Sequence, residues 1–419
     1  MRGLNIWVVM SLLIIGTMLL SRCVHTGHQE NEDPRGEGYA MEKTCINCHR
    51  QTAGSYMHTV HYNTSSAVGA ATLEKLVASL RDQFYFLDSS YIRVQKDKDG
   101  LYQYHFKQGV NTFSARLDIA FGSGEKAQTY GYWKDSVLHQ LPLSWFTGTH
   151  TWANSPGFSP QHARFDRVIV SRCFECHASY IKKEVVQSGP LSVTEHLDKS
   201  SIVYGIGCQR CHGPAQQHVQ FHQDNPLVKT ARYMVSIKTL TRQQQLDICA
   251  VCHSGNDQEV RRTLFDFVPG DTLSHFFFPD FGAGRRDPDV HGKQVQLLQT
   301  SRCYQRTNMT CTTCHDPHAS ENIRMEVFIA RCMDCHAEVK HTGVKLANSS
   351  CIDCHMPLQT SKLIHFTRTD RRFVVRRTDI RSFRKTDYIF QKIRFPDTTG
   401  AELKDIPYLI RTHKIAIYK

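Results

Sequence analysis

The sequence predicts a chain of short α-helices and irregular loops that is interrupted by one β-rich segment. Two observations predict this. The first is a Cys-x-x-Cys-His pattern that occurs seven times in 419 residues, far more often than 16 cysteines and 24 histidines would produce by chance. The second is a run of β-branched and aromatic residues between the first two patterns. The seven patterns are Cys45, Cys48 and His49; Cys173, Cys176 and His177; Cys208, Cys211 and His212; Cys249, Cys252 and His253; Cys311, Cys314 and His315; Cys332, Cys335 and His336; and Cys351, Cys354 and His355.

Each pattern predicts the covalent attachment of a c-type haem. Two thiols one helical turn apart can each form a thioether with a haem vinyl group, and the adjacent histidine can reach the iron as its proximal ligand. The alternative is zinc, because Cys-x-x-Cys pairs also build zinc ribbons. Zinc does not require a histidine directly after the second cysteine, yet all seven pairs have one. We therefore expect seven haems and the fold class of a multihaem cytochrome c, with short helices and irregular loops around a haem core.

The β-rich insertion lies between the first and second patterns. Residues 91–94 and 101–106 flank a Lys-Asp-Lys-Asp-Gly turn, which predicts a β-hairpin. Residues 113–121 predict a further strand that ends at Gly122. The strongest local helix signal is at 241–252, which leads into the fourth pattern. We divide the remaining chain into a first haem-binding segment at 41–90, the β-rich insertion at 91–147, a six-haem core at 148–366 and a basic carboxy-terminal extension at 367–419.

The amino terminus predicts export. Residues 1–22 have the positive start and short apolar run of a signal sequence, and residues 23–40 are polar, as expected of a tether. The residues from Leu19 to Cys23 resemble the lipobox of bacterial lipoproteins, with Arg22 where a small residue is usual. We expect a periplasmic or outer-membrane-associated protein, because c-type haem is attached outside the bacterial inner membrane. Lipidated Cys23 or an uncleaved anchor would hold it at the membrane.

The charge distribution bears on partners. The formal net charge is +12, but each haem brings two propionates and one ferric centre, which leaves about +5 in the oxidised protein and about −2 when every iron is reduced. No nucleic-acid-binding motif accompanies the basic residues. From Ser361 to Lys419, 15 Lys and Arg stand against six Asp and Glu. There are two interpretations of this tail. It is a solvent-exposed segment that surrounds the core, or it is a docking surface for an acidic redox partner or for anionic lipid.

Seven irons also need distal ligands. Once the motif histidines and those at 25, 28 and 413 are set aside, 14 histidines remain for seven positions, so every iron can be bound by two histidines. His318 is held near the fifth motif by Pro317, and His218 and His222 have the spacing of one helix face. The candidate distal ligands are His58, His61, His218, His222, His291, His318 and His365.

Several motifs resemble bacterial multihaem cytochromes that carry the cytochrome c-554/c-prime type of domain. They are the stretches 205–214, 309–318, 351–357 and 56–63, together with Gly122-Ser-Gly124 and residues 128–130. The resemblance covers about residues 41–366. It implies electron transfer through closely packed haems with two axial histidines, and it supports His218, His291, His318 and His365 as ligands.

Two classes of function are consistent with these features. The first is electron transfer by a carrier in a periplasmic or cell-surface redox chain, in contact with redox partner proteins. The second is a multihaem oxidoreductase that acts on a small nitrogen or sulfur compound at one haem with an open distal side. No motif replaces its histidine by lysine, and no catalytic residue stands out. The sequence favours the carrier and leaves enzymatic activity open.

Overall fold

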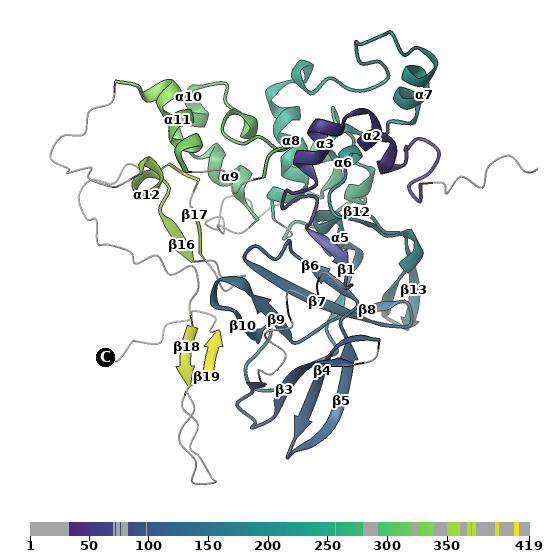
Figure 1. The fold of residues 1–419 in the computed structure, drawn as a ribbon, viewed down its shortest axis with the longest axis vertical. Helices are drawn as coiled ribbons and strands as arrows, with labels where there is room; N and C mark the ends of the chain where they lie inside the picture. Colours follow the sequence, from purple (N-terminus) through teal and green to yellow (C-terminus); the bar gives the residue numbers. More distant parts are fainter. Residues whose placement is uncertain are drawn as a thin grey trace, which may run out of the picture.

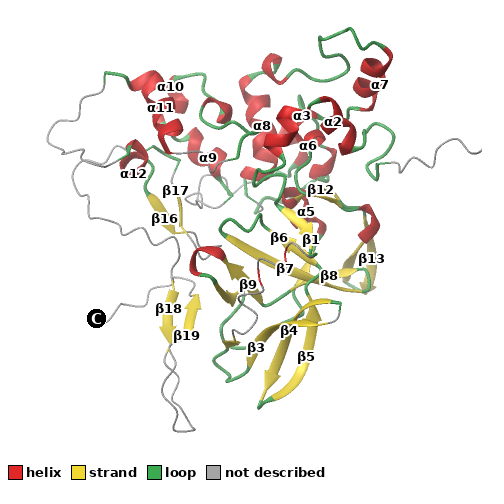
Figure 2. Ribbon diagram, viewed as in Figure 1, coloured by secondary structure: helices red, strands yellow, loops and turns green. Residues whose placement is uncertain are grey.

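The computed structural model has a helical part, which carries the seven motifs, beside a β-sheet part (Figures 1 and 2). It describes residues 33–69, 72, 76, 83–97, 99–255, 257–279, 292–320, 325–338, 350–360, 367–369, 371–373, 390–393 and 406–409. No helix within these ranges is both long and apolar enough to cross a membrane. The predicted signal sequence, Cys23, His291 and His365 lie outside the described residues.

The β part contains two antiparallel sheets. The four-stranded sheet has the order β2-β3-β4-β5, and the seven-stranded sheet has the path β1-β6-β7-β8-β11, with β9 paired to β7 and β10 paired to β9. The strands of the first sheet are β2 (Gln83–Tyr85), β3 (Tyr91–Asp97), β4 (Gly100–Lys107) and β5 (Val110–Arg116). Those of the second are β1 (Ser65–Ala67), β6 (Ile119–Phe121), β7 (Ala127–Lys134), β8 (Val137–Gln140), β9 (Leu143–Phe146), β10 (Thr151–Asn154) and β11 (Val168–Ile169).

The predicted hairpin is present as β3 and β4, with Asp97 opposite Gly100 at the turn. Alternate residues of β3 face the core, where Ile92 and Val94 are fully buried, as the two-residue period of a strand requires. The β region extends beyond the expected limits of 91–147, because β1 and β2 precede it and β10 and β11 follow it. These flanking strands have two to four residues, too few for a period to be visible in the sequence.

The single strand expected at 113–121 is two strands in different sheets. β5 ends at Arg116 and β6 begins at Ile119. Between them Leu117 donates its backbone N–H to Leu101 in the first sheet, and Asp118 donates to Gly131 in the second. The alternation of apolar and polar residues continues from Ala115 through Leu117 to Ile119, so hydrophobicity gives no sign of the break. Gly122 ends β6 with φ of +100°, a conformation that favours glycine.

The helical part is built from short segments, as expected. The motifs lie on α2 (Glu42–Cys48), α5 (Ser171–His177), α6 (Cys208–His212), α8 (Arg242–His253), the 3-10 turn η7 (Cys311–Thr313), α11 (Met325–His336) and α12 (Cys351–His355). The other helices are α3 (Arg50–Tyr56), α7 (Gln216–Asp224), α9 (Gln294–Gln299) and α10 (Arg302–Arg306). The 3-10 turns are η2 (Thr147–Thr149), η3 (Lys199–Ser201), η4 (Ile237–Thr239), η5 (Leu264–Asp266) and η6 (Leu273–Phe276). Paired short strands are β12 (Ala178–Tyr180) with β15 (Val203–Tyr204), β13 (Lys183–Gly189) with β14 (Ser192–Leu197), β16 (Leu358–Thr360) with β17 (Thr367–Thr369), and β18 (Phe390–Ile393) with β19 (Ile406–Leu409).

Buried apolar residues join the two parts. One cluster lies within the β part and includes Phe86, Tyr130 and Phe146. A second connects the seven-stranded sheet to the second motif, because Phe121 of β6 packs edge-to-face on Phe174 of α5 with ring centroids 5.2 Å apart. The second attachment site is therefore fixed directly against the sheet.

Candidate haem attachment sites and axial histidines

Each motif occupies about one turn of helix. Six of the seven lie in α-helices and the fifth lies in a 3-10 turn. Residues three and four positions apart share one side of a helix, so the two cysteines and the histidine of a motif point the same way. α8 is the predicted helix at 241–252, and it begins at a capping box formed by Thr241 and Gln244. Every cysteine of the described residues is free of disulfide bonds.

His218 lies opposite the first motif's histidine. The rings of His49 and His218 have centroids 6.4 Å apart and nearly parallel planes, inclined by 18°. His218 Nδ1 is 2.8 Å from the carbonyl oxygen of Arg232. A hydrogen bond at Nδ1 fixes the ring and leaves Nε2 available, which is the usual arrangement of a metal-binding histidine.

His318 lies opposite the third motif's histidine. The rings of His212 and His318 have centroids 5.9 Å apart and planes inclined by 15°. Burial lowers the pKa of His212 and so favours the neutral imidazole that binds metals. His318 also contacts Tyr56 edge-on, and its backbone N–H donates to Asp316 in the turn after the fifth motif.

His61 lies opposite the fourth motif's histidine. The rings of His61 and His253 have centroids 6.0 Å apart and nearly perpendicular planes, at 87°. His61 follows α3, so the first haem-binding segment reaches the fourth motif. The backbone of His61 is held in place because its carbonyl oxygen accepts a hydrogen bond from the N–H of Ile206.

These three separations fit an iron between two imidazoles. Two metal–nitrogen bonds of about 2 Å, plus the distance from each nitrogen to its ring centre, place the centroids about 6 Å apart. The two axial rings can have any relative rotation about the common axis, so parallel and perpendicular planes both fit.

The remaining candidates have different surroundings. His222 is next to His218, at 4.6 Å between ring centroids; its Nδ1 is 3.1 Å from Val228 O and its Nε2 is buried without a hydrogen-bond partner. His58 is exposed. His177 of the second motif is 3.1 Å from Thr64 Oγ1 and contacts Phe121 edge-on, and burial lowers its pKa.

The basic extension reaches one motif. Arg371 Nη1 is 2.9 Å from His315 Nε2 in the fifth motif.

Cysteines of different motifs lie together. Glu42 carboxylate, Cys45 Sγ and Cys208 Sγ are all within 4.8 Å of one another. Cys252 Sγ of the fourth motif lies 3.6 Å from the carbonyl oxygen of Glu175 in the second motif. Arg242 of α8, which carries the fourth motif, donates to the carbonyl oxygen of Met309, two residues before the fifth motif, at 3.0 Å.

Several residues that hold the motifs together were not singled out from the sequence. Glu42 accepts the N–H of Cys208 at 2.6 Å, and the Gln209 side chain bonds both backbone groups of Ala40. Arg210 donates to the carbonyl oxygens of Leu264 and Glu175. Gln209 and Arg210 are the variable positions of a Cys-x-x-Cys-His motif, where the pattern itself carries no signal for a structural role.

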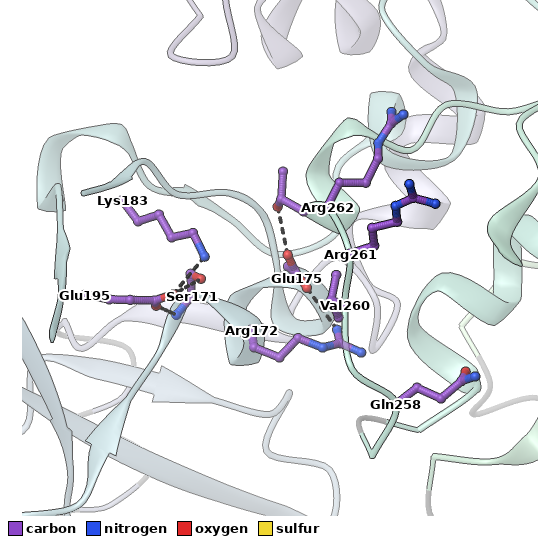
Figure 3. A pocket seen from close by; sticks show the side chains of 10 residues that line it. Ser171, Arg172, Glu175, Lys183, Glu195, Gln258, Val260, Arg261 and Arg262 are labelled. Carbon is purple, nitrogen blue, oxygen red and sulfur yellow. Dashed lines mark hydrogen bonds and ion pairs between the residues drawn. The ribbon is translucent and has the colours of Figure 1, made fainter. Parts of the chain in front are cut away.

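A polar cavity of about 520 Å³ lies beside α5 (Figure 3). Its charged groups are largely paired with one another. Glu175 accepts from Arg172 at 3.0 Å, from Thr263 Oγ1 at 2.8 Å and from Leu264 N at 3.0 Å, and Glu195 accepts from Lys183 at 2.8 Å. The cavity's clearest role is therefore structural, because it ties the second motif to the loop at 263–264.

Comparisons with known proteins agree with the motif chemistry. No family model matches the chain. The chain is 26% identical over 200 residues to "Multiheme cytochrome MtrA" of Shewanella baltica (strain OS185), a match that covers 42% of this chain and 54% of the relative. The chain thus aligns with about half of that relative's length. The solved structure of "Outer Cell Wall Cytochrome OcwA" is similar with a TM-score of 0.49 at 15% identity, over 80% of each chain. The similarity to a multihaem cytochrome, together with the repeated attachment motif, supports a multihaem c-type cytochrome.

Proposed function

We propose that the chain is an exported heptahaem c-type cytochrome that transfers electrons in a periplasmic or cell-surface redox chain. The observation that carries the proposal is that three motif histidines each face a histidine from outside the motifs at 5.9–6.4 Å between ring centroids. An iron bound on both sides changes its ligands little when it gains or loses an electron. This favours transfer over chemistry on a substrate.

The residues that would hold the haems are those of the seven motifs. The 14 motif cysteines would form the thioethers and the seven motif histidines the proximal bonds, while His218, His318 and His61 would be the distal ligands of the first, third and fourth sites. Bound haem supplies reversible one-electron chemistry, and the chain tunes it through axial ligand, burial and nearby charge. His58, His222, His291 and His365 remain predicted ligands of the other sites.

Membrane attachment and partners belong to the same proposal. The polar segment after the apolar run supports a tether, and Cys23 would carry the lipid. The excess of Lys and Arg in the basic extension supports docking of an acidic redox partner.

Electron paramagnetic resonance of the oxidised protein, combined with carbon monoxide addition to the reduced protein, tests the proposal. We expect low-spin signals throughout and no carbon monoxide adduct. His218→Ala, His318→Ala and His61→Ala should each create one high-spin haem that binds carbon monoxide. His196→Ala is the matched control, because His196 lies on β14, is hydrogen-bonded to Ser136 between β7 and β8, and faces no motif histidine in the described residues. A stoichiometric high-spin haem in the unmodified protein would instead favour an oxidoreductase with an open site.

A further inference from the structure

The main-chain oxygen of Glu175 is a meeting point of three motifs. Glu175 lies between the cysteines of the second motif. Its carbonyl oxygen accepts a hydrogen bond from Arg210 Nη2 of the third motif at 3.1 Å, and Cys252 Sγ of the fourth motif lies 3.6 Å from the same oxygen. Glu175 is 2% exposed, so this contact is inside the protein. The second, third and fourth motifs therefore touch at one buried atom.

The fourth motif is joined to two other motifs by different groups. Cys252 Sγ is 3.6 Å from the carbonyl oxygen of Glu175 in the second motif. α8 is also joined to the segment before the fifth motif, since Arg242 donates to the carbonyl oxygens of Tyr304 at 2.6 Å and Met309 at 3.0 Å. The fourth motif thus contacts the second, third and fifth.

The first motif lies at an edge of this arrangement. Cys45 is within 4.8 Å of Cys208 of the third motif, and Glu42 and Gln209 form the hydrogen bonds between the same two segments. At the opposite edge, His315 of the fifth motif packs edge-on against Phe328 of α11, which carries the sixth motif, with ring centroids 5.4 Å apart. α11 also contacts α12, which carries the seventh motif.

We propose that the fourth attachment site, Cys249, Cys252 and His253 with His61, is a branch point at which three lines of attachment sites meet. This rests on the proposed function of electron transfer. One line leads through the third site to the first, one leads to the second site against the β-sheet, and one leads through the fifth to the sixth and seventh. Cysteines are bonded at the haem periphery, so a close approach of two motifs brings the two porphyrin edges close to each other.

A branch gives the chain of electron-transfer sites three ends, at the first, second and seventh sites, where an unbranched line would have two. Electron exchange between neighbouring sites oxidises one ferrous iron and reduces one ferric iron, with no bond made or broken, and its rate falls steeply with edge separation. An electron entering at the first or the second site would pass the fourth site on its way to the seventh. The end at the second site lies against the β part, where His177 contacts Thr64 and Phe121.

The test counts the haems whose midpoint potentials shift when the axial ligand of one site is replaced. His61→Met should replace a nitrogen ligand by a thioether at the fourth site, which raises the potential of that haem. A reduced haem changes the charge felt by its neighbours, so we expect the midpoint potentials of three other haems to shift in a potentiometric titration of the haem-loaded protein. His218→Met, at the first site, is the matched control and should shift one other haem. Each variant should show the methionine–iron charge-transfer band in the far red.

The outcomes separate the branch from the ligand assignment. If His61→Met gains the methionine band but shifts two haems or fewer, the sites form a line and the branch is wrong. If neither variant gains the band, the axial assignments of the proposed function fail. In that case the unmodified protein is used to test the branch. The same applies if a variant does not bind seven haems. The potentiometric titration of the unmodified protein is fitted with an interaction term for each pair of haems. We expect the fit to require one haem that interacts strongly with three others. A fit in which every haem has at most two strong interactions would overturn the proposal.

Discussion

Removal of the Glu175 carboxylate should weaken the link between the second motif and the loop at 263–264. This side chain is 3% exposed and accepts three hydrogen bonds, from Arg172, Thr263 and the backbone of Leu264. Glu175→Ala would leave the buried N–H of Leu264 without a partner, at about 1–3 kcal/mol. It would also leave Arg172, whose side chain is 19% exposed, without its carboxylate.

We expect Glu175→Ala to lower the free energy of unfolding by about 3–5 kcal/mol, the range for loss of one partner from a buried ion pair. Glu175→Gln should lose less, because the amide oxygen can still accept from Leu264. The assay is denaturant unfolding of the haem-loaded protein, followed by far-ultraviolet circular dichroism. Glu184→Ala on the exposed face of β13 is the control, with a change of about 0.5 kcal/mol or less. A loss under about 1 kcal/mol for Glu175→Ala would show that the three hydrogen bonds do not support the motif.

Three further predictions concern cofactor load, membrane attachment and pH. Mass spectrometry of the mature chain should show the added mass of seven haems, and six or fewer would contradict full occupancy. Cys23→Ala should move the protein to the soluble fraction or block its processing; unchanged processing and membrane binding would exclude lipidation. Burial lowers the pKa of His139, so the unfolded chain binds a proton more readily, and stability should fall as the pH drops below about 6.5. His139→Gln should make this decline shallower in urea titrations, and an unchanged slope would rule out His139 as its source.

Features fixed by neighbouring residues could be predicted from the sequence. The hairpin of β3 and β4 was predicted from its Asp-Gly turn and alternating strands, and α8 from the apolar and polar spacing that leads into the fourth motif. The one-turn helices follow from the spacing within each motif. In these cases the pattern and the structure involve the same few residues.

Features fixed by distant residues could not be predicted in this way. His218 was a candidate ligand because of its helical spacing with His222, but its position opposite His49 depends on where the folded chain places α7 relative to the first motif. Likewise, the crossing of the chain between sheets at Leu117 depends on partners in β4 and β7, which hydrophobicity does not identify. Candidate ligands could therefore be named from the sequence, but which histidines face each other could be seen only in the tertiary structure.

The close approach of cysteines from different motifs bears on how the protein is made. Cys45 Sγ and Cys208 Sγ, of the first and third motifs, lie within 4.8 Å of each other. In the oxidising compartment where c-type haem is attached, such pairs form disulfides if the chain packs first. Each disulfide would consume cysteines of two motifs and block both. If these cysteines hold haems as proposed, we expect haem attachment to precede tertiary packing, so that the chain closes only after its thiols have been converted to thioethers.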